Sequence, residues 1–467
     1  MKQDTIAAIA TGMTSAGIGI IRVSGTEAID IIDRIYLSKN GRKASELEDH
    51  KLCLGDIMSP KGEKFDEVLL SVMRAPHSYT GENTVEINCH GGIYLCARVL
   101  ALVLASGARI AEPGEFTKRA FLNGKMDLSQ AEAVMDLIRS ENDFAAKNAL
   151  RQVEGAVYER ISSLREKILH ELAYIEAALD DPEHYDLTDY PEELDGKVCD
   201  FIEEIEKILL VSKNGRIRKE GIRTAILGKP NAGKSSVLNL LAGHESAIVT
   251  DIAGTTRDAI EESVRLGELQ LNLIDTAGIR DTEDKVEQIG VEKAIRIADD
   301  ADLIFFVADS SAPIDENDIQ IADRIKDKRI ILLYNKTDLH SLTSPEDMLR
   351  LFSDKAGEAG KRYPLIPISA KNGEGLVDLQ RTLEEMFLSS VSFLNEDLIL
   401  TNLRQLEELR LAKESLYLVL NAIRSFMTED IFAIDLSDSY KHLGYIIGEE
   451  MGDDLADKIF SEFCMGK

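Results

Sequence analysis

A glycine-rich run with the chemistry to wrap a phosphate lies near the middle of the chain, at Gly228–Ser235. It reads Gly-Lys-Pro-Asn-Ala-Gly-Lys-Ser, which fits the phosphate-loop pattern G-x-x-x-x-G-K-[ST]. The strand-like run Ile222–Leu227 precedes it and a helix-like pattern follows, which is the context that the motif requires. Glycines let the backbone turn its N–H groups toward phosphates, and the N-terminus of the helix adds partial positive charge. We expect Lys234 to reach the β- and γ-phosphates of a nucleotide and Ser235 to ligate Mg²⁺.

Two later segments carry groups that distinguish purine bases. Asn335-Lys336-Thr337-Asp338 follows the strand-like run 330–334, and the Asp338 carboxylate can accept hydrogen bonds from N1–H and the exocyclic amine of guanine. Adenine has an acceptor at N1 and is rejected there. Ser369-Ala370-Lys371 follows the run 365–368 and can place backbone groups on the guanine O6. These motifs, in this order at strand ends, predict GTP rather than ATP as the ligand.

Two loops between these motifs have the composition of nucleotide-sensing segments. Asp275-Thr276-Ala277-Gly278 follows the run 269–274, so its carboxylate can hold the metal through water and Gly278 can offer its N–H to the γ-phosphate. Thr250–Asp258 contains Thr256, which we expect to sense the γ-phosphate and ligate Mg²⁺ when the loop orders. An ordinary strand-to-loop turn and a plain surface loop remain alternatives for the two segments.

The residue that orients the attacking water in Ras-like enzymes is missing. That enzyme class has a glutamine directly after Asp-x-x-Gly, whereas this chain has Ile279, which can neither donate nor accept a hydrogen bond. Asn231 in the phosphate loop is a candidate to hold a monovalent cation against the phosphates. Glu287 and Arg280 are candidates for positioning water and supplying charge, although composition alone favours a solvated loop charge for each.

The full prediction for the nucleotide site draws on all of these segments. The catalytic candidates are Glu287, Arg280, Thr256 and Lys234. The residues expected to bind GTP are Asn231, Ala232, Gly233, Lys234, Ser235, Ser236, Thr250, Asp251, Ile252, Ala253, Gly254, Thr255, Thr256, Asp275, Thr276, Ala277, Gly278, Asn335, Lys336, Thr337, Asp338, Ser369, Ala370 and Lys371.

The elements that must position these residues alternate between β-like and helical patterns over residues 222–388, which predicts a mostly parallel, doubly wound sheet. Residues 1–120 read as mixed α/β, with strands at 19–23, 68–73 and 84–88 and a helix at 94–105. Helical periodicity covers 128–179 and returns over 198–210, ending near Asn214-Gly215, with a loop expected at Asp180–Asp195. It returns again over 395–463, so we expect the two helical stretches to pack together around an inserted α/β domain.

Composition sets wider limits. The chain has 467 residues, enough for about three domains, and a net charge of −29, which opposes broad electrostatic binding of nucleic acid. No apolar run is long enough to span a membrane and no signal peptide is evident, so we expect a cytoplasmic protein. Five cysteines include no C-x-x-C pair, which favours neither a disulfide framework nor a zinc site.

The chain resembles the tRNA modification GTPases of the MnmE (TrmE) family over nearly its whole length. Besides the GTPase motifs, the resemblance rests on Gly17–Gly25, Tyr79–Glu82, His90–Gly92, Pro113–Phe116, Arg119–Leu128 and the tail Cys464–Lys467, in which Met465 replaces the usual isoleucine. It implies a multidomain α/β plus α fold: an N-terminal α/β folate-binding and dimerisation domain (1–120), a split helical domain (121–218 and 389–467) and an inserted doubly wound P-loop G domain (219–388).

The resemblance also implies cofactors and their ligands. The family activates GTP hydrolysis with K⁺ and uses Mg²⁺, and the matching K⁺ ligands are Asn231, Thr250, Ile252 and Thr255. Glu287 matches the family's water-orienting glutamate. Contacts to 5-formyl-tetrahydrofolate carry over to Arg22, Glu86, Lys125 and Lys467, and Cys464 is a possible reactive thiol beside them.

The activity implied by the resemblance is a joint one. Together with a flavoprotein of the MnmG (GidA) family, such homodimers add a carboxymethylaminomethyl-type group to the wobble uridine, position 34, of certain tRNAs. The main alternative is a GTP-dependent switch in ribosome assembly or signalling, which would not need the folate residues or the tail. A structural scaffold with a decayed G domain is a second alternative, opposed by the intact Lys234, Ser235, Thr256, Asp275 and Asp338.

Overall fold

The computed structural model of the chain describes residues 4–59, 62–140, 142–181, 183–184, 187–243, 262–267, 269–274, 298, 301–352, 363–387, 398–449, 453–461, 463 and 466. Contacts divide it into two compact units. One consists of Met1–Leu209 and Asn402–Lys467, and the other of Leu210–Thr401. No helix among the described residues is long and apolar enough to cross a membrane.

The second unit is built on a six-stranded sheet with the order β13-β12-β11-β8-β10-β9. Its strands are β8 (Ile222–Leu227), β9 (Glu262–Leu266), β10 (Leu269–Leu273), β11 (Leu303–Asp309), β12 (Ile330–Asn335) and β13 (Leu365–Pro367). All neighbours pair in parallel except β9, which is antiparallel to β10 at the edge. The expected mostly parallel sheet is therefore confirmed, and β8, β10, β12 and β13 lie within one residue of the runs 222–227, 269–274, 330–334 and 365–368.

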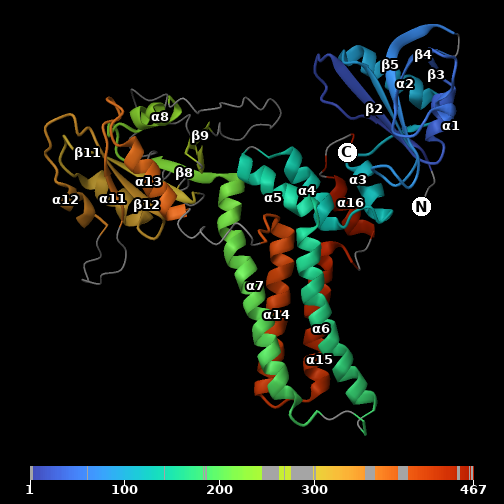
Figure 1. Cartoon of the computed structure of the whole chain (residues 1–467). Coiled ribbons are helices and arrows are strands. Elements are labelled where there is room, and N and C mark those ends of the chain that lie inside the picture. The colour runs from blue at the N-terminus through green and yellow to red at the C-terminus, as the bar shows by residue number, and fades with distance from the viewer. Residues whose placement is uncertain are drawn as a thin grey trace. The chain divides into compact units, whose positions relative to one another are not determined.

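Helices cover both faces of this sheet, as Figure 1 shows. The side chains of Leu303, Phe305 and Val307 on β11 pack with α8 (Lys234–Ala242) and α13 (Leu376–Phe387) in one buried cluster. Those of Ile304 and Phe306 pack in another with α11 (Glu316–Ile325) and α12 (Pro345–Arg350). Successive side chains of a strand point to opposite faces, so a continuous apolar run suits a strand covered on both sides.

The first unit contains a seven-stranded sheet with the order β3-β4-β5-β6-β2-β1-β7. The strands are β1 (Ile6–Ile9), β2 (Ile18–Ser24), β3 (Tyr36–Ser38), β4 (Leu52–Met58), β5 (Lys64–Met73), β6 (Thr84–His90) and β7 (Arg109–Ile110). Helices α1 (Ala28–Asp33) and α2 (Ile93–Ala105) pack against it in one buried cluster. A second cluster joins β1 to Phe116 of α3 (Glu115–Leu122). The sequence patterns had predicted only β2, β5, β6 and α2.

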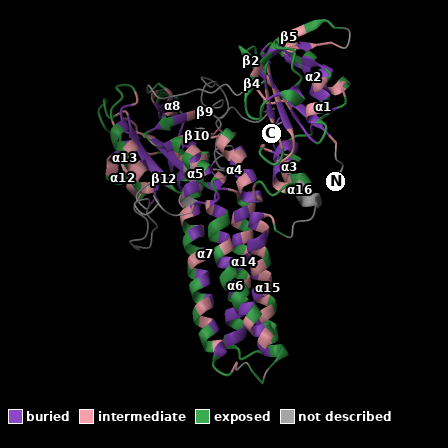
Figure 2. Cartoon of the chain, turned by 45° about the vertical axis from the view of Figure 1, so that its right-hand side comes forward, coloured by how far each residue is buried: buried purple, intermediate pink, exposed green. Residues whose placement is uncertain are grey.

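The remaining helices of the first unit come from both ends of the chain. They are α4 (Leu128–Ile138), α5 (Asp143–Val153), α6 (Ala156–Asp180), α7 (Tyr190–Glu220), α14 (Leu403–Arg424), α15 (Glu429–Ile447) and α16 (Asp453–Ser461). The long helices α6, α7, α14 and α15 run side by side, with buried residues facing inward (Figure 2).

Ion pairs join the two helical stretches across about 270 residues of sequence. Arg404 donates to both carboxylate oxygens of Glu132 at 2.8 Å, and Arg165 donates to the carbonyl of Tyr440 while its guanidinium lies 4.0 Å from the Tyr440 ring. The expectation that these stretches pack together is confirmed.

Two expected element boundaries are wrong. The loop expected at Asp180–Asp195 is shorter, because α7 already begins at Tyr190, and Pro191 fits the first turn, where its missing N–H would have no partner in the helix. Helix α7 also continues through Gly215 to Glu220 instead of ending near Asn214. A Cβ at Gly215 would lie 2.1 Å from Cγ2 of Ile399, so this glycine permits close packing inside a helix and does not end it.

Candidate nucleotide-binding site

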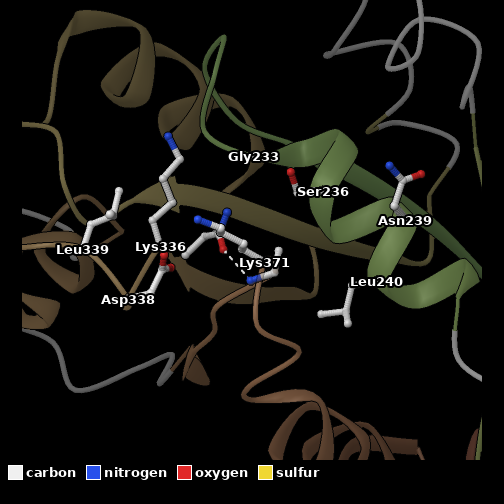
Figure 3. Close-up of a pocket in the computed structure, with 10 residues that line it drawn as sticks. Gly233, Ser236, Asn239, Leu240, Lys336, Asp338, Leu339 and Lys371 are labelled. Carbon is white, nitrogen blue, oxygen red and sulfur yellow. Dashed lines mark hydrogen bonds between the residues drawn. The ribbon is translucent and has the colours of Figure 1, made fainter.

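Three loops at the carboxyl ends of parallel strands meet around a cavity of about 570 Å³. They follow β8, β12 and β13, and the first turns of α8 complete the wall (Figure 3). Ligands of doubly wound sheets bind at this edge, because the loops there are not part of the sheet's hydrogen bonding. The cavity is lined by Gly233, Ser236, Asn239, Leu240, Asn335, Lys336, Asp338, Leu339, Ala370 and Lys371.

The phosphate loop takes its shape from glycines at its two ends. Gly228 has φ 148°, and a Cβ there would lie 2.2 Å from the carbonyl oxygen of Val307. Gly233 caps α8 with φ 98°, in the left-handed region that side chains other than glycine rarely adopt. Asn231, inside the loop, is exposed and also has a positive φ of 62°. The backbone therefore curls before entering the helix, as the motif predicts.

The side chain of Lys234 lies back over its own loop. Its Nζ donates hydrogen bonds to the carbonyl oxygens of Gly228 and Lys229, both at 2.8 Å. Burial lowers the pKa of the Lys234 ammonium from its ordinary value. Both bonds go to neutral carbonyls, so the ammonium can exchange them for the charged oxygens of a phosphate, which are stronger acceptors.

The buried side chain of Asn335 ties the three loops together. Its Nδ2 donates to the carbonyl oxygen of Ala232 at 2.9 Å, and its Oδ1 accepts from the backbone N–H of Ala370 at 3.2 Å. Asn335 is only 2% exposed. One amide therefore sets the spacing between the phosphate loop and the loops expected to hold the base.

The proposed base-reading carboxylate is exposed and oriented. Asp338 accepts a hydrogen bond at Oδ1 from the hydroxyl of Ser369 at 2.8 Å, which leaves Oδ2 and a further lone pair for a ligand. Lys336, two residues earlier, has φ 62° and places its Nζ 2.5 Å from Oδ2 of Asp309. Asp338 and Lys336 lie on the opposite side of the cavity from α8 in Figure 3.

The described residues thus account for the phosphate-loop, Asn335–Asp338 and Ser369–Lys371 parts of the predicted site. The residues predicted at 250–256 and 275–278, together with Arg280 and Glu287, lie outside the described residues. The sequence analysis missed Asn239, Leu240, Leu339 and Asp309. Helical spacing from Ser236 would have found Asn239 and Leu240, since positions three and four apart share a face.

A second group of predicted residues lies on the sheet of the first unit. Arg22 and Glu86 face each other across β2 and β6, with Arg22 Nε 2.9 Å from Glu86 Oε1. The Arg22 guanidinium lies 5.3 Å from the centroid of the Tyr79 ring and 5.7 Å from that of Phe116. Lys125 is exposed and donates to the carbonyl of Pro76 at 3.2 Å.

Gly466, near the C-terminus, contacts the same arginine. Arg22 Nη1 lies 3.4 Å from the carbonyl oxygen of Gly466, which has φ 86°. A Cβ at Gly466 would lie 2.4 Å from the carbonyl oxygen of Ile9 on β1, so the tail fits against this strand only with glycine at that position. Cys464 and Lys467, the predicted thiol and folate ligand, lie outside the described residues.

A phosphate loop joining a strand to a helix, in a doubly wound parallel sheet with an Asn-Lys-x-Asp segment at the end of a later strand, defines a P-loop GTPase. Models of protein families extend this assignment: residues 5–125 match the GTP-binding protein TrmE N-terminus, and residues 128–464 match the MnmE helical domain. The chain therefore belongs to the MnmE family of tRNA modification GTPases.

Individual relatives match over the full length. A protein of Lachnoclostridium phytofermentans called tRNA modification GTPase MnmE is 50% identical, with 100% of both chains covered. A protein of the same name from Clostridioides difficile is 43% identical, over 100% of this chain and 99% of its own. The crystal structure of the G domain of the T. maritima FeoB iron transporter matches 35% of this chain and 97% of its own at 25% identity, with a TM-score of only 0.25.

Proposed function

We propose that this chain hydrolyses GTP to drive a step of tRNA modification, with the nucleotide held in the cavity between α8 and the loops after β12 and β13. The observation that carries this proposal is the amide of Asn335, which bonds the phosphate loop and the Ala370 backbone at once. It brings a phosphate-binding and a base-reading group to one cavity of suitable size for a nucleotide.

Guanine is the base that this cavity suits. The Asp338 carboxylate accepts hydrogen bonds from the N1–H and the exocyclic amine of guanine, while Oδ1 of Asp338 also accepts a hydrogen bond from the Ser369 hydroxyl. The backbone N–H of Lys371, which lines the same cavity, can meet O6, while the N–H of the neighbouring Ala370 is donated to Asn335. Adenine would direct its N1 lone pair at the carboxylate, which is repulsive, so ATP is excluded.

At the phosphate end the residues of this chain bind and neutralise charge. The backbone N–H groups at the N-terminus of α8 would face the phosphates, and Lys234 would exchange its two carbonyl acceptors for phosphate oxygens. Ser235 and Thr256 would hold Mg²⁺, which neutralises phosphate charge when bound. Asp275 would help to hold Mg²⁺ through water, and Gly278 would offer its backbone N–H to the γ-phosphate.

Because Ile279 offers no hydrogen bond, hydrolysis needs another source of charge and of water positioning. Asn231, with the backbone of Thr250, Ile252 and Thr255, would hold K⁺, which adds positive charge beside the phosphates when bound. Asn231 suits this role because its side chain is exposed and is therefore free to bind an ion. Its φ of 62° lies in the left-handed region, which asparagine adopts more readily than most residues. Glu287 orients water and Arg280 supplies further charge in this scheme.

The first unit is proposed to bind 5-formyl-tetrahydrofolate. Arg22 is paired with Glu86, and its guanidinium lies near the half-buried Tyr79 ring, so this part of the unit offers a cation, a carboxylate and an aromatic ring. A pteridine ring needs donor and acceptor groups in its plane, and the folate carboxylates need cations, for which Lys125 and Lys467 are suited. A switch that acts in ribosome assembly or signalling has no use for this arrangement, so it is the weaker alternative.

The complete reaction is proposed to need a homodimer and a flavoprotein of the MnmG (GidA) family. The product is a carboxymethylaminomethyl-type group on the wobble uridine, position 34, of certain tRNAs. A net charge of −29 suits a division of labour in which the partner carries much of the RNA binding. A salt titration of tRNA binding with and without the partner tests this, and tight binding without the partner contradicts it.

The nucleotide assignment is tested by the rates of GTP and ATP hydrolysis in KCl and in NaCl, for the unsubstituted chain and for Asn231→Ala. We expect GTP alone to be hydrolysed, faster in KCl, with the advantage of KCl lost in Asn231→Ala. Hydrolysis of ATP at a similar rate would refute the guanine site. Equal rates in the two salts, unaltered in the variant, would refute the K⁺ role alone.

A further inference from the structure

Lys336 is held at both ends in the cavity. Its backbone lies in the left-handed region, with φ 62°, and its carbonyl oxygen accepts a hydrogen bond from the hydroxyl of Ser310 at 3.0 Å. At the other end, its Nζ lies 2.5 Å from Oδ2 of Asp309. The side chain between these anchors lines the cavity. In Figure 3 it extends away from Asp338.

Asp309 is prepared to hold this lysine. It is the last residue of β11, and its side chain is 10% exposed. Its Oδ1 accepts from the backbone N–H of Ser311 at 2.8 Å and from the Ser311 hydroxyl at 2.6 Å, which leaves Oδ2 directed at Lys336. Burial acts to raise the pKa of Asp309, but the hydrogen bonds from Lys336 and Ser311 outweigh it, and the pKa is lowered. The carboxylate is therefore ionised at neutral pH.

A free lysine at this position would interfere with the base-reading carboxylate. Asp338 lies only two residues from Lys336 on the same wall of the cavity and is exposed. A lysine side chain has four rotatable methylene groups, so an unheld ammonium can reach a carboxylate nearby and pair with it. Such a pair would occupy the acceptor oxygens that guanine needs and cancel their charge.

We propose that Asp309 is a positioning residue for guanine recognition, which keeps the Lys336 ammonium away from Asp338 and its methylene groups extended along the cavity. This rests on the proposed role of Asp338. Asp309 touches no ligand in this role and acts through Lys336. The ion pair between Asp309 and Lys336 also neutralises the charge of the lysine, which lines the cavity where the purine ring is proposed to bind.

A double-mutant cycle on the full-length chain tests the proposal. The dissociation constants of GDP and IDP are measured for the unsubstituted chain, Asp309→Asn, Lys336→Met and the double variant. IDP keeps N1–H but lacks the exocyclic amine, so the ratio of the two constants reports how well Asp338 reads that amine. We expect Asp309→Asn to weaken GDP binding about tenfold, or about 1.4 kcal/mol, and to narrow the preference for GDP over IDP.

The double variant distinguishes positioning from support of the fold. Without the ammonium, Asp309→Asn is expected to add less than a twofold loss to that of Lys336→Met, and the preference for GDP over IDP returns. A merely structural role would weaken GDP and IDP equally and to the same extent in both backgrounds. That additive result, or an unchanged preference in Asp309→Asn, would overturn the proposal.

Three further variants make the outcome unambiguous. Asp302→Asn makes the same substitution just before the other end of β11, where Asp302 accepts from the backbone N–H of Arg223, and it should leave GDP binding within twofold. If Asp309→Asn does not fold, Ser311→Ala retains the carboxylate and the hydrogen bond from the backbone N–H of residue 311 but removes the bond from the hydroxyl to Oδ1. A two- to threefold loss of GDP affinity is expected, whereas no loss contradicts the proposal. Asp338→Ala must abolish the preference for GDP over IDP. If it does not, the guanine assignment itself falls, and the role of Asp309 falls with it.

Discussion

Replacing Asn335 by alanine tests whether one buried amide holds the nucleotide site together. The substitution removes the hydrogen bonds to Ala232 and Ala370, and leaves one carbonyl and one N–H without this partner. Each lost bond costs about 1–2 kcal/mol when its partner remains, so the expected total is about 2–4 kcal/mol. At 1.4 kcal/mol for each tenfold change, GDP affinity falls by about 30-fold or more.

The lost hydrogen bonds should weaken GDP binding more than they lower the melting temperature, because they join loops whose relative positions the sheet does not determine. The dissociation constant of GDP is measured by fluorescence titration, and the melting temperature is measured without nucleotide. Asn239→Ala is the matched control: Asn239 lines the same cavity but is exposed on α8, so its loss should change affinity less than threefold. If Asn335→Ala binds GDP within twofold of the unsubstituted chain, the amide does not link the loops and the reasoning is wrong.

Three other substitutions test the nucleotide site, the proposed folate site and the pH dependence of stability, one each. Gly233→Ala would place a Cβ 2.2 Å from Nδ2 of Asn335 and force a left-handed backbone, so GDP affinity should fall at least tenfold; retained affinity in the same titration would show that the loop adapts. Gly466→Ala would place a Cβ 2.4 Å from the Ile9 carbonyl and displace the tail, so 5-formyl-tetrahydrofolate should bind at least fivefold more weakly, whereas Gly196→Ala, with open space around it, should not alter binding. For Glu115, burial acts to raise the pKa, but hydrogen bonds from Arg109 and Arg119 outweigh it and the pKa is lowered from 4.5. The unfolded state therefore takes up this proton first, and the contribution of Glu115 to the free energy of unfolding is complete above pH 4.5 and is lost as the pH falls below it. In Arg119→Met, the free energy of unfolding measured in urea should change less with pH in that range. An unchanged pH dependence would show that Arg119 does not lower the pKa of Glu115.

Much of the second unit was predictable from local pattern. Residues 303–308 and 330–334 are unbroken apolar runs, which suit a sheet covered on both faces, and each is followed at once by polar residues. The phosphate loop was predictable because its glycines and lysine are contiguous in sequence. The sheet of the first unit was less predictable, since β3 and β7 have three and two residues, too few to show a period.

The boundaries of α7 illustrate what local pattern misses. Pro191 and Gly215 are both signals for the absence of helix, yet both lie within α7. The proline stands in the first turn, where it costs no hydrogen bond, and the glycine leaves space for Ile399, a residue 184 positions away. The second of these reasons depends on a distant partner that no window of sequence contains.

The sequence by itself determined the glycine-rich pattern of the phosphate loop and the parallel order of the sheet, and it predicted the base-reading carboxylate, because contiguous residues and strand periodicity carry that information. Tertiary structure alone decided that Asn335 joins two loops, that Asp309 holds Lys336, and that Gly466 lies against β1 beside Arg22. Each of these contacts joins residues that are between 27 and 457 positions apart, and only the folded chain brings such residues within hydrogen-bonding distance or contact.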